Sequence, residues 1–457
     1  MNEIYNNTDT ICAISTPPGA GGIAVIRISG PDTISIVQKI WSGAKLQTMQ
    51  SHTVHLGNIV EQSSCEVLDQ AVLTLFRAPN SYTTQDVIEL SVHGSKWIQS
   101  AVVQAIVNAG ARLALPGEFT RRAYINGRLD LVEAEAVGDL IASNSRAAHR
   151  LAMTQLKGTF SKRFNQLREA LIELASLMEL ELDFAEEEVE FASREKLSTL
   201  SKEIIAEIDK LVRSFKAGNA IKNGIPVAIL GATNAGKSSL LNKLLEEDRA
   251  IVSDIHGTTR DVIEDTVTFG DYLVRLMDTA GLRCTNDQIE QLGIERSHQM
   301  AAKASHVLYL VDATDPQLPD PDNIDPRYLF IINKRDIQDT SELENSIKQK
   351  FPKNEILAIT TYDADDIEKV RQTIQKRIAA EAHNEGDVTI TNLRHAQALT
   401  EAAQNLRNLL HNMEFGIPTD LLAQDLRQSI DALSAITGQI TTPEILNKIF
   451  QSYCIGK

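Results

Sequence analysis

The chain has 457 residues, of which 43% are hydrophobic and 23% are charged, as is typical of a globular protein with two to four domains. No apolar run approaches the roughly 20 residues that a membrane-spanning helix needs, so we expect no membrane protein. The formal net charge of −16 excludes a surface that binds nucleic acid throughout, so nucleic-acid contacts are expected to be local or made through a partner.

The first residues lack the basic start of a signal peptide, and nothing in them indicates export. The four cysteines have no metal-type spacing, which suits a reducing compartment, so we expect a cytoplasmic protein; they are Cys12, Cys65, Cys284 and Cys454. Basic residues exceed acidic ones between residues 121 and 168. This excess either contacts nucleic acid locally or lies on a solvated helix face, and the solvated face is the more common case.

Residues 1–126 combine strand and helix patterns. The strands are predicted at residues 23–28, 72–76 and 87–92, and an amphipathic helix at residues 96–109. Two loops rich in glycine and proline, at residues 16–22 and 115–122, permit tight turns of the backbone. The first of these is not a phosphate-binding loop, because no Lys-Ser pair follows its glycines.

From Leu129 onward the hydrophobic period becomes that of helices, and helical periodicity returns after residue 380. Each apolar stripe has to be buried against another, so the helices on both sides of residues 224–380 are expected to form one bundle. The predicted domains are therefore an α/β domain at residues 1–126, a helical domain at residues 127–223 and 381–457, and an inserted Ras-like P-loop domain at residues 224–380.

The inserted segment opens with a strand, a glycine-rich loop and a helix. A short apolar run leads into Gly231, four free positions, Gly236, Lys237 and Ser238, and then helical spacing begins. In such a loop the backbone N–H groups surround phosphates, the lysine reaches the β- and γ-phosphate oxygens, and the hydroxyl holds Mg²⁺. The agreement of strand, glycines, lysine, hydroxyl and helix favours a nucleotide site over a chance glycine turn.

Three later segments indicate that the nucleotide is a guanine nucleotide. In the polar loop at residues 254–261, Thr259 is positioned to complete the Mg²⁺ ligands, and the segment at residues 278–281 reads Asp-Thr-Ala-Gly, the pattern of a switch that senses hydrolysis. Residues 333–336 read Asn-Lys-Arg-Asp, and the Asp336 carboxylate matches the two edge N–H groups of guanine. Adenine lacks these donors, so ATP should be rejected. Alone, this last segment would be an ordinary charged turn.

Leucine occupies the position where Ras-like enzymes carry a glutamine that orients the attacking water. The side chain of Leu282, which follows Gly281, has neither a donor nor an acceptor. Another group has to place the water, and Glu290 is the acidic candidate. The alternative is that Glu290 is a solvated residue at the start of the next helix.

Taken together, four features resemble the MnmE family (also called TrmE) of tRNA-modifying GTPases over essentially the full length. They are the Pro-Pro-Gly-x-Gly-Gly loop followed by Arg27-Ile28-Ser29-Gly30, the Pro116-Gly117-Glu118-Phe119 loop, the GTPase insert in a helical domain, and the ending Cys454-Ile455-Gly456-Lys457. The resemblance implies a homodimer held mainly by the N-terminal domains, which would bind 5-formyltetrahydrofolate as one-carbon donor. It also implies a complex with the FAD-containing partner MnmG, and together the two would add an aminomethyl-type group at C5 of the wobble uridine (U34) in the tRNA anticodon.

The resemblance also implies roles for individual residues. Folate would be held by Arg27, Glu89, Arg128 and Lys457, and Cys454 would take part in the modification, unless it is a half-buried thiol without a role. Potassium, in the place of an arginine finger, would be bound by Asn234, Ser253, Ile255 and Thr258, although asparagine also favours loops by itself. Mg²⁺ would be bound by Ser238 and Thr259. The residues expected to bind GTP are Asn234, Ala235, Gly236, Lys237, Ser238, Ser239, Ser253, Asp254, Ile255, His256, Gly257, Thr258, Thr259, Asp278, Thr279, Ala280, Gly281, Asn333, Lys334 and Asp336.

Two other functions fit parts of this pattern. A regulatory GTPase of ribosome assembly shares a leucine at the switch but not a folate-binding N-terminal domain. A scaffold that binds nucleotide without turning it over would need no water-positioning group. The guanine-supporting loop, Ile359-Thr360-Thr361, also departs from the usual Ser-Ala-Lys or Ser-Ala-Arg.

Overall fold

The computed structural model describes residues 8–183, 194–246, 264–278, 299–382, 388–415, 417–451, 453 and 456. These residues form two compact units, one made of residues up to 141, 152–205 and from 401 onward, the other of residues 142–151 and 206–400. In the described part of the chain, no helix is both long enough and apolar enough to cross a membrane.

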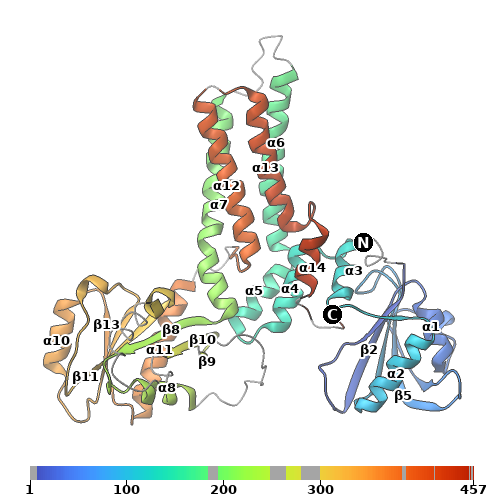
Figure 1. The fold of residues 1–457 in the computed structure, drawn as a ribbon, viewed down its shortest axis with the longest axis horizontal. Helices are drawn as coiled ribbons and strands as arrows, with labels where there is room; N and C mark the ends of the chain where they lie inside the picture. Colours follow the sequence, from blue (N-terminus) through green and yellow to red (C-terminus); the bar gives the residue numbers. More distant parts are fainter. Residues whose placement is uncertain are drawn as a thin grey trace, which may run out of the picture. The chain divides into compact units, whose positions relative to one another are not determined.

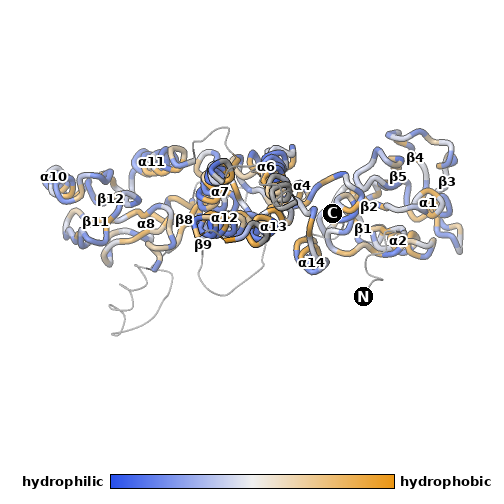
Figure 2. The backbone as a smooth tube through the Cα atoms, turned by 90° about the horizontal axis from the view of Figure 1, so that it is seen from above, coloured by the Kyte–Doolittle hydropathy of each residue, from blue (hydrophilic) through white to orange (hydrophobic). Residues whose placement is uncertain are grey.

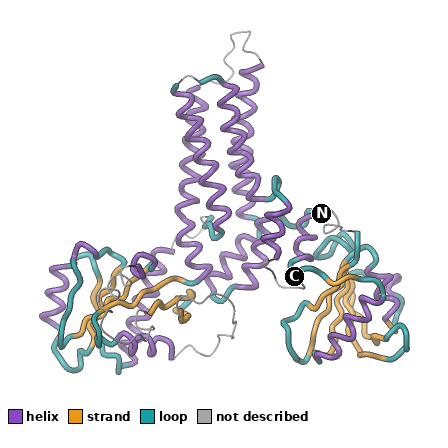
Figure 3. The backbone as a smooth tube through the Cα atoms, in the orientation of Figure 1, coloured by secondary structure: helices purple, strands orange, loops and turns teal. Residues whose placement is uncertain are grey.

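The first unit contains a seven-stranded, mostly antiparallel sheet with the order β3-β4-β5-β6-β2-β1-β7. Figure 3 draws the strands of the protein in orange and its helices in purple. Its strands are β1 (Ile11–Ile14), β2 (Ile23–Ser29), β3 (Trp41–Ser42), β4 (Thr53–Val60), β5 (Val67–Phe76), β6 (Val87–His93) and β7 (Arg112–Leu113). Strands β2, β5 and β6 alternate between buried and less buried residues because one face packs on α1 (Thr33–Ile40) and α2 (Lys96–Asn108). A 3₁₀ turn, η2 (Leu46–Thr48), precedes β4.

The predicted strands and helix of this region are confirmed, with one difference in extent. Strand β5 begins at Val67, five residues before the predicted start at Val72. Asp69 interrupts the apolar pattern at the start of this strand. It is a buried carboxylate that accepts hydrogen bonds from the backbone N–H and ring Nδ1 of His93 on β6. A polar residue with a partner on the neighbouring strand is therefore part of the sheet interior.

The two halves of the opposite sheet face differ in how they are covered. Next to β1, Phe119 of α3 (Glu118–Ile125) packs on Ile11 and Ala13 and is fully buried. On β4 and β5, Leu56 and Val72 are direct partners in the register and are 67% and 36% exposed. This part of the face has no cover from other described residues of the chain.

A further group of helices, most of them long, carries apolar stripes; Figure 2 shows that hydrophobic and hydrophilic residues are mixed within them. They are α4 (Leu131–Ala142), α5 (Arg146–Leu156), α6 (Thr159–Asp183), α7 (Arg194–Asn223), α12 (Leu393–Glu414), α13 (Thr419–Thr437) and α14 (Pro443–Gln451). Helices α6 and α13 lie side by side (Figure 1) and bury leucines such as Leu171 and Leu426. Helix α4 begins with a capping box in which Asp130 and Glu133 each accept a hydrogen bond from the other's backbone N–H.

The second unit contains a six-stranded sheet with the order β13-β12-β11-β8-β10-β9. Its strands are β8 (Ile225–Gly231), β9 (Glu264–Phe269), β10 (Tyr272–Asp278), β11 (His306–Asp312), β12 (Tyr328–Asn333) and β13 (Glu355–Ala358), and its helices are α8 (Lys237–Glu246), α10 (Ser341–Lys350) and α11 (Ala364–Ala382), with a 3₁₀ turn η4 (Pro321–Asn323). Among these strands β9 alone is antiparallel to its neighbour. Strands β8, β11 and β12 are almost continuously buried, as parallel strands covered on both faces should be.

Candidate functional site

The phosphate loop lies between β8 and α8 and depends on two glycines. Gly231 and Gly236 have φ values of +140° and +98°. A Cβ at Gly231 would lie 2.3 Å from the carbonyl oxygen of Leu310, and one at Gly236 would lie 2.2 Å from Nδ2 of Asn333. Neither position can hold a side chain without moving its neighbour, so the loop keeps its backbone open to a ligand.

Lys237, the first residue of α8, turns back over the loop. Its Nζ donates hydrogen bonds to the carbonyl oxygens of Gly231, at 2.9 Å, and Ala232, at 2.6 Å. The ammonium group is thereby held at the loop, where the free N–H groups of the helix start add positive potential. The residues present therefore fit a phosphate group.

The amide of Asn333 joins the carboxyl end of β12 to the phosphate loop. Its Nδ2 donates to the carbonyl oxygen of Ala235 at 2.9 Å, and the side chain is buried. Its Oδ1 is also buried and has no hydrogen-bond partner among the described residues. A buried acceptor without a donor costs free energy, so this atom is available to a donor that a bound molecule brings.

Lys334 and Asp336 follow on the same turn. The Lys334 backbone has a φ of +68°, and its Nζ donates to the carboxylate of Asp312 at the end of β11. Burial by itself raises the pKa of Asp312, but hydrogen bonds from Lys334 and Thr314 outweigh burial and hold this pKa below its usual range. The Asp336 carboxylate is exposed, so it is open to a ligand.

A second turn supports this one. The Arg335 backbone N–H donates to the carbonyl oxygen of Ile359 at 3.1 Å, and its guanidinium pairs with the fully buried carboxylate of Asp366 at 2.6 Å. The same carboxylate accepts from the backbone N–H of Thr360 at 2.8 Å. Asp366 therefore fixes the loop whose sequence departs from the usual pattern. Neither Asp312 nor Asp366 was expected from the sequence, since their partners come from other strands and helices.

A separate cluster in the first unit brings together Arg27 and Glu89. They are direct partners on β2 and β6, and their side chains form an ion pair at 2.8 Å. The Arg27 guanidinium lies over the rings of Tyr82 and Phe119, at 5.4 and 5.6 Å from the ring centres. Burial raises the pKa of Tyr82, while the hydrogen bond with Thr120 and the charges of Arg27 and Arg128 oppose this rise. Aromatic rings and cations here fit a planar, carboxylate-bearing ligand.

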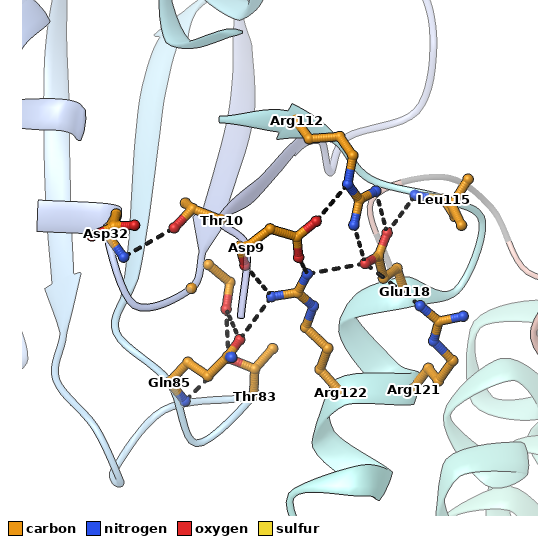
Figure 4. A network of polar contacts seen from close by, with 12 residues as sticks. Asp9, Thr10, Asp32, Thr83, Gln85, Arg112, Leu115, Glu118, Arg121 and Arg122 are labelled. Carbon is orange, nitrogen blue, oxygen red and sulfur yellow. Dashed lines mark hydrogen bonds and ion pairs between the residues drawn. The ribbon is translucent and has the colours of Figure 1, made fainter. Parts of the chain in front are cut away.

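A partly buried ion network lies beside this cluster (Figure 4). Glu118, 1% exposed, accepts hydrogen bonds from Arg112, Arg122 and the backbone N–H of Leu115. Asp9 accepts from the same two guanidinium groups. The network fixes the loop that leads into α3 and so holds the Phe119 ring in place. The sequence marked this loop as a tight turn but gave no sign of the network, because Asp9 lies more than 100 positions away from Arg112.

The end of the chain lies against β1. The Ser15 hydroxyl donates to the carbonyl oxygen of Gly456 at 3.0 Å, and a Cβ at Gly456 would lie 2.2 Å from the carbonyl oxygen of Ile14. Cys454 and Lys457, on either side of Gly456, lie outside the described residues. The contact places Gly456 at the sheet that carries Arg27.

The chain matches known proteins over its whole length. Residues 10–128 match the model of the GTP-binding protein TrmE N-terminus, and residues 131–454 match that of the MnmE helical domain. The tRNA modification GTPase MnmE of Parabacteroides distasonis is 46% identical over 464 residues, which cover 98% of this chain and 100% of that relative. The protein of the same name from Cytophaga hutchinsonii is 43% identical, with 99% of each chain covered.

The chain belongs to the MnmE family. The resemblance and the fold class expected from the sequence are both confirmed. Among solved structures, a variant of Aquifex aeolicus Era bound to GDP and AlF₄⁻ is 26% identical and covers 39% of this chain and 66% of its own. Its TM-score of 0.27 is too low to support any inference.

In this MnmE family member, only part of the expected GTP site lies in the described residues. Asn234, with a φ of +64°, Ser238 and Ser239 lie at the phosphate loop, and Asp278 ends β10. Outside the described residues lie Ser253, Asp254, Ile255, His256, Gly257, Thr258, Thr259, Thr279, Ala280, Gly281, Leu282 and Glu290. The roles of all these residues stay predictions.

Proposed function

We propose that the chain is a K⁺-activated GTPase that acts in the modification of the wobble uridine of tRNA. Relatives at 46% and 43% identity are named tRNA modification GTPases, and the matches span their full length. The observation that supports GTP binding best is Asn333: it ties the phosphate loop to the base-recognising turn, and its buried Oδ1 has no partner among the described residues. Asp336, three positions later, is exposed to meet guanine.

Hydrolysis in this proposal depends on positioned charges. Lys237 neutralises the β- and γ-phosphates, and the first turn of α8 supplies N–H donors. Ser238 and Thr259 would hold Mg²⁺, whose charge offsets that of the phosphates when it is bound. Asn234, Ser253, Ile255 and Thr258 would hold K⁺; the exposed Asn234 side chain fits that use. Glu290 would orient the attacking water in place of the side chain that Leu282 lacks.

The modification itself would need partners. We propose a homodimer formed through the N-terminal domains and a heterotetramer with an MnmG-type protein that carries FAD, working on the anticodon region of tRNA in the cytoplasm. The one-carbon donor, of the 5-formyltetrahydrofolate type, would bind at Arg27, Glu89, Arg128 and Lys457. The Arg27 guanidinium over the Tyr82 ring supports this position, and Cys454 would act nearby on the uridine or the carbon carrier.

The test is steady-state hydrolysis by the full-length protein in K⁺ and then in Na⁺ at equal ionic strength, with ATP as the control substrate. We expect GTP turnover in K⁺ alone and none with ATP. Asp336→Asn should raise the KM for GTP at least about 100-fold, because its amide group presents donors to the donors of guanine. Asp315→Asn, at another exposed carboxylate of the same unit, should leave KM unchanged. Equal turnover in Na⁺, or with ATP, would contradict the proposal.

A further inference from the structure

A cavity of about 320 Å³ opens in the second unit, at the amino-terminal ends of the strands. The phosphate loop lies at the opposite, carboxyl-terminal ends. Strands β8 and β11 begin at the cavity, with Ile225 and His306, whereas the phosphate loop follows the carboxyl end of β8. Helices α7 and α11 supply most of the remaining walls. The volume is at the lower end of the range found for small-molecule sites, and no residue of the proposed GTP site lines it.

The cavity has an apolar side and a charged side. The apolar side is formed by Ala217, Ala220, Ile221, Ile225 and Ile378. The charged side carries Arg213 and Lys216, about one turn apart on α7, together with Arg327 and Glu381. Arg327 pairs with Asp325 at 2.7 Å, so it adds little free charge. The charges of Arg213 and Lys216 against one carboxylate leave the lining positive.

His306 is the buried polar group of this cavity. It is 2% exposed, and its Nδ1 has no hydrogen-bond partner within the described part of the chain. Its Nε2 lies 3.7 Å from the Glu381 carboxylate, which is too far for a good hydrogen bond. A buried imidazole with both nitrogens poorly satisfied is costly unless another molecule pairs with it.

We propose that this cavity is a binding site for a small organic oxyanion, a phosphate or carboxylate attached to an apolar group. The apolar part would cover Ile221 and Ile378, and the oxyanion would meet Arg213 and Lys216 and accept a hydrogen bond from a ring N–H of His306. Such a ligand would contact both α7, the helix before β8, and α11, the helix after β13. The site shares no residue with the proposed GTP site or with the cluster around Arg27 and Glu89.

The charges of the side chains that line the cavity favour an anionic ligand over a neutral or cationic one. Helices α7 and α11 both end near the cavity, and their carboxyl ends carry partial negative charge that favours cations. The full charges of Arg213 and Lys216 lie on the cavity wall itself and outweigh these partial charges. A neutral apolar ligand would leave the buried imidazole of His306 without a matching group.

The experiment is saturation-transfer NMR on the full-length protein, saturated with Mg²⁺ and GDP so that the phosphate loop is filled. The probes are phenyl phosphate, benzoate and benzyl alcohol, which share a ring and differ in charge. We expect phenyl phosphate or benzoate to bind and benzyl alcohol to give no signal, and the stronger of the two anions identifies the oxyanion. Silence from both anions, or equal binding of benzyl alcohol, would overturn the proposal.

Variants locate the binding. The double variant Arg213→Ala with Lys216→Ala should raise the Kd for the anion at least about tenfold, since charge-assisted hydrogen bonds are among the stronger polar contacts. Ala217→Leu should also weaken binding of the anion, because the larger side chain fills the apolar side of the cavity. Lys202→Ala, at an exposed lysine of the same helix outside the cavity, is the matched control and should change nothing. Unchanged GDP affinity shows that each variant is folded, and an anion signal that survives the double substitution would place the ligand elsewhere and refute the site.

Discussion

At the scale of single residues, the phosphate loop is closed by the hydrogen bond from the Asn333 amide to the carbonyl oxygen of Ala235. The spacing of Gly231, Gly236 and Lys237 indicates the loop because each residue type is required by local geometry. The contact between Asn333 and Ala235 joins positions 98 apart in the sequence, and it explains why Gly236 has to be glycine. Sequence spacing carries no information on such a contact.

Gly236→Ala should therefore weaken nucleotide binding strongly while the protein stays folded. The new Cβ would lie 2.2 Å from the Asn333 amide, at a φ of +98° that side chains rarely adopt. We expect the Kd for a fluorescent GDP analogue to rise at least about 30-fold, from strain of about 1–3 kcal/mol plus the lost loop closure. Gly127→Ala has a similar strain, with a φ of +72°, but an open surrounding, so it should bind GDP normally. Normal binding by Gly236→Ala would show that the loop is not closed as described.

His306 should make the second unit sensitive to acid. Burial, together with the charges of Arg377 and Arg327, lowers the pKa of His306 to about 4 from its ordinary 6.5. Between these values the unfolded chain binds more protons than the folded one, so stability falls as the pH falls. We expect a loss of about 2 kcal/mol from pH 7.5 to pH 5 that is absent in His306→Gln.

The measurement is differential scanning calorimetry of the full-length protein, in which the transition of the nucleotide-binding unit is the one that GDP shifts upward. The groups that face the imidazole are Glu381 and Arg377 on α11, Arg327 before β12 and Lys216 on α7. Burial raises the pKa of Glu381, so protonation of this carboxylate favours the folded state as the pH falls and opposes the effect of His306. Glu381 is present in both proteins, so the comparison with His306→Gln isolates the imidazole. Parallel pH profiles for the wild type and His306→Gln would contradict the prediction.

At the scale of elements, α3 shows where local pattern stops being informative. Six of its eight residues are buried, and two of these six are arginines, Arg121 and Arg122, which a sequence alone would place in solvent. The helix is held by the pairs of Glu118 and Arg122 with Arg112 and Asp9. Charged side chains are predicted at the surface by default, and only their partners in space reverse that expectation.

Glu118→Gln should destabilise the N-terminal sheet strongly. The substitution keeps the size of the side chain but leaves the guanidinium groups of Arg112, Arg121 and Arg122 without this buried carboxylate, at a cost of roughly 3–5 kcal/mol. Both tryptophans of the chain, Trp41 and Trp97, lie in this region, so tryptophan fluorescence during urea unfolding reports on it selectively. Glu66→Gln, at an exposed position of the same region, should leave the midpoint unchanged.

The same network predicts an acid limit. Burial raises the pKa of Glu118, but the hydrogen bonds from Arg112 and Leu115 prevail and hold the pKa below its ordinary 4.5. A depressed folded-state pKa gives stability that is present above pH 4.5 and is lost as the pH falls through the folded value. The difference between the wild type and Glu118→Gln should therefore shrink below this ordinary value. A difference in unfolding free energy that stays constant with pH would mean that side-chain packing, and not the charge of Glu118, stabilises α3.

At the scale of the whole molecule, periodicity and motifs were enough to predict the fold class, because long stripes and an alternating sheet are local properties. They were not enough to predict which surfaces stay uncovered. The outer face of β4 and β5 exposes Val54, Leu56 and Val72, at 63%, 67% and 36%, while the opposite face packs on α1 and α2. Adjacent exposed apolar residues of this kind on a sheet are typical of an interface between proteins.

If the proposed homodimer forms through this face, Leu56→Asp should separate it. A carboxylate in the centre of an apolar contact loses its water without gaining a partner, and such central positions contribute at least about 2 kcal/mol, or roughly a 30-fold rise in the dimer dissociation constant. Sedimentation velocity over a concentration series measures this constant, and tryptophan fluorescence checks the fold. Leu421→Asp, at a leucine of α13 that is 53% exposed, makes the same change away from the sheet and should stay dimeric. A Leu56→Asp protein that remains dimeric would place the dimer contact on another surface.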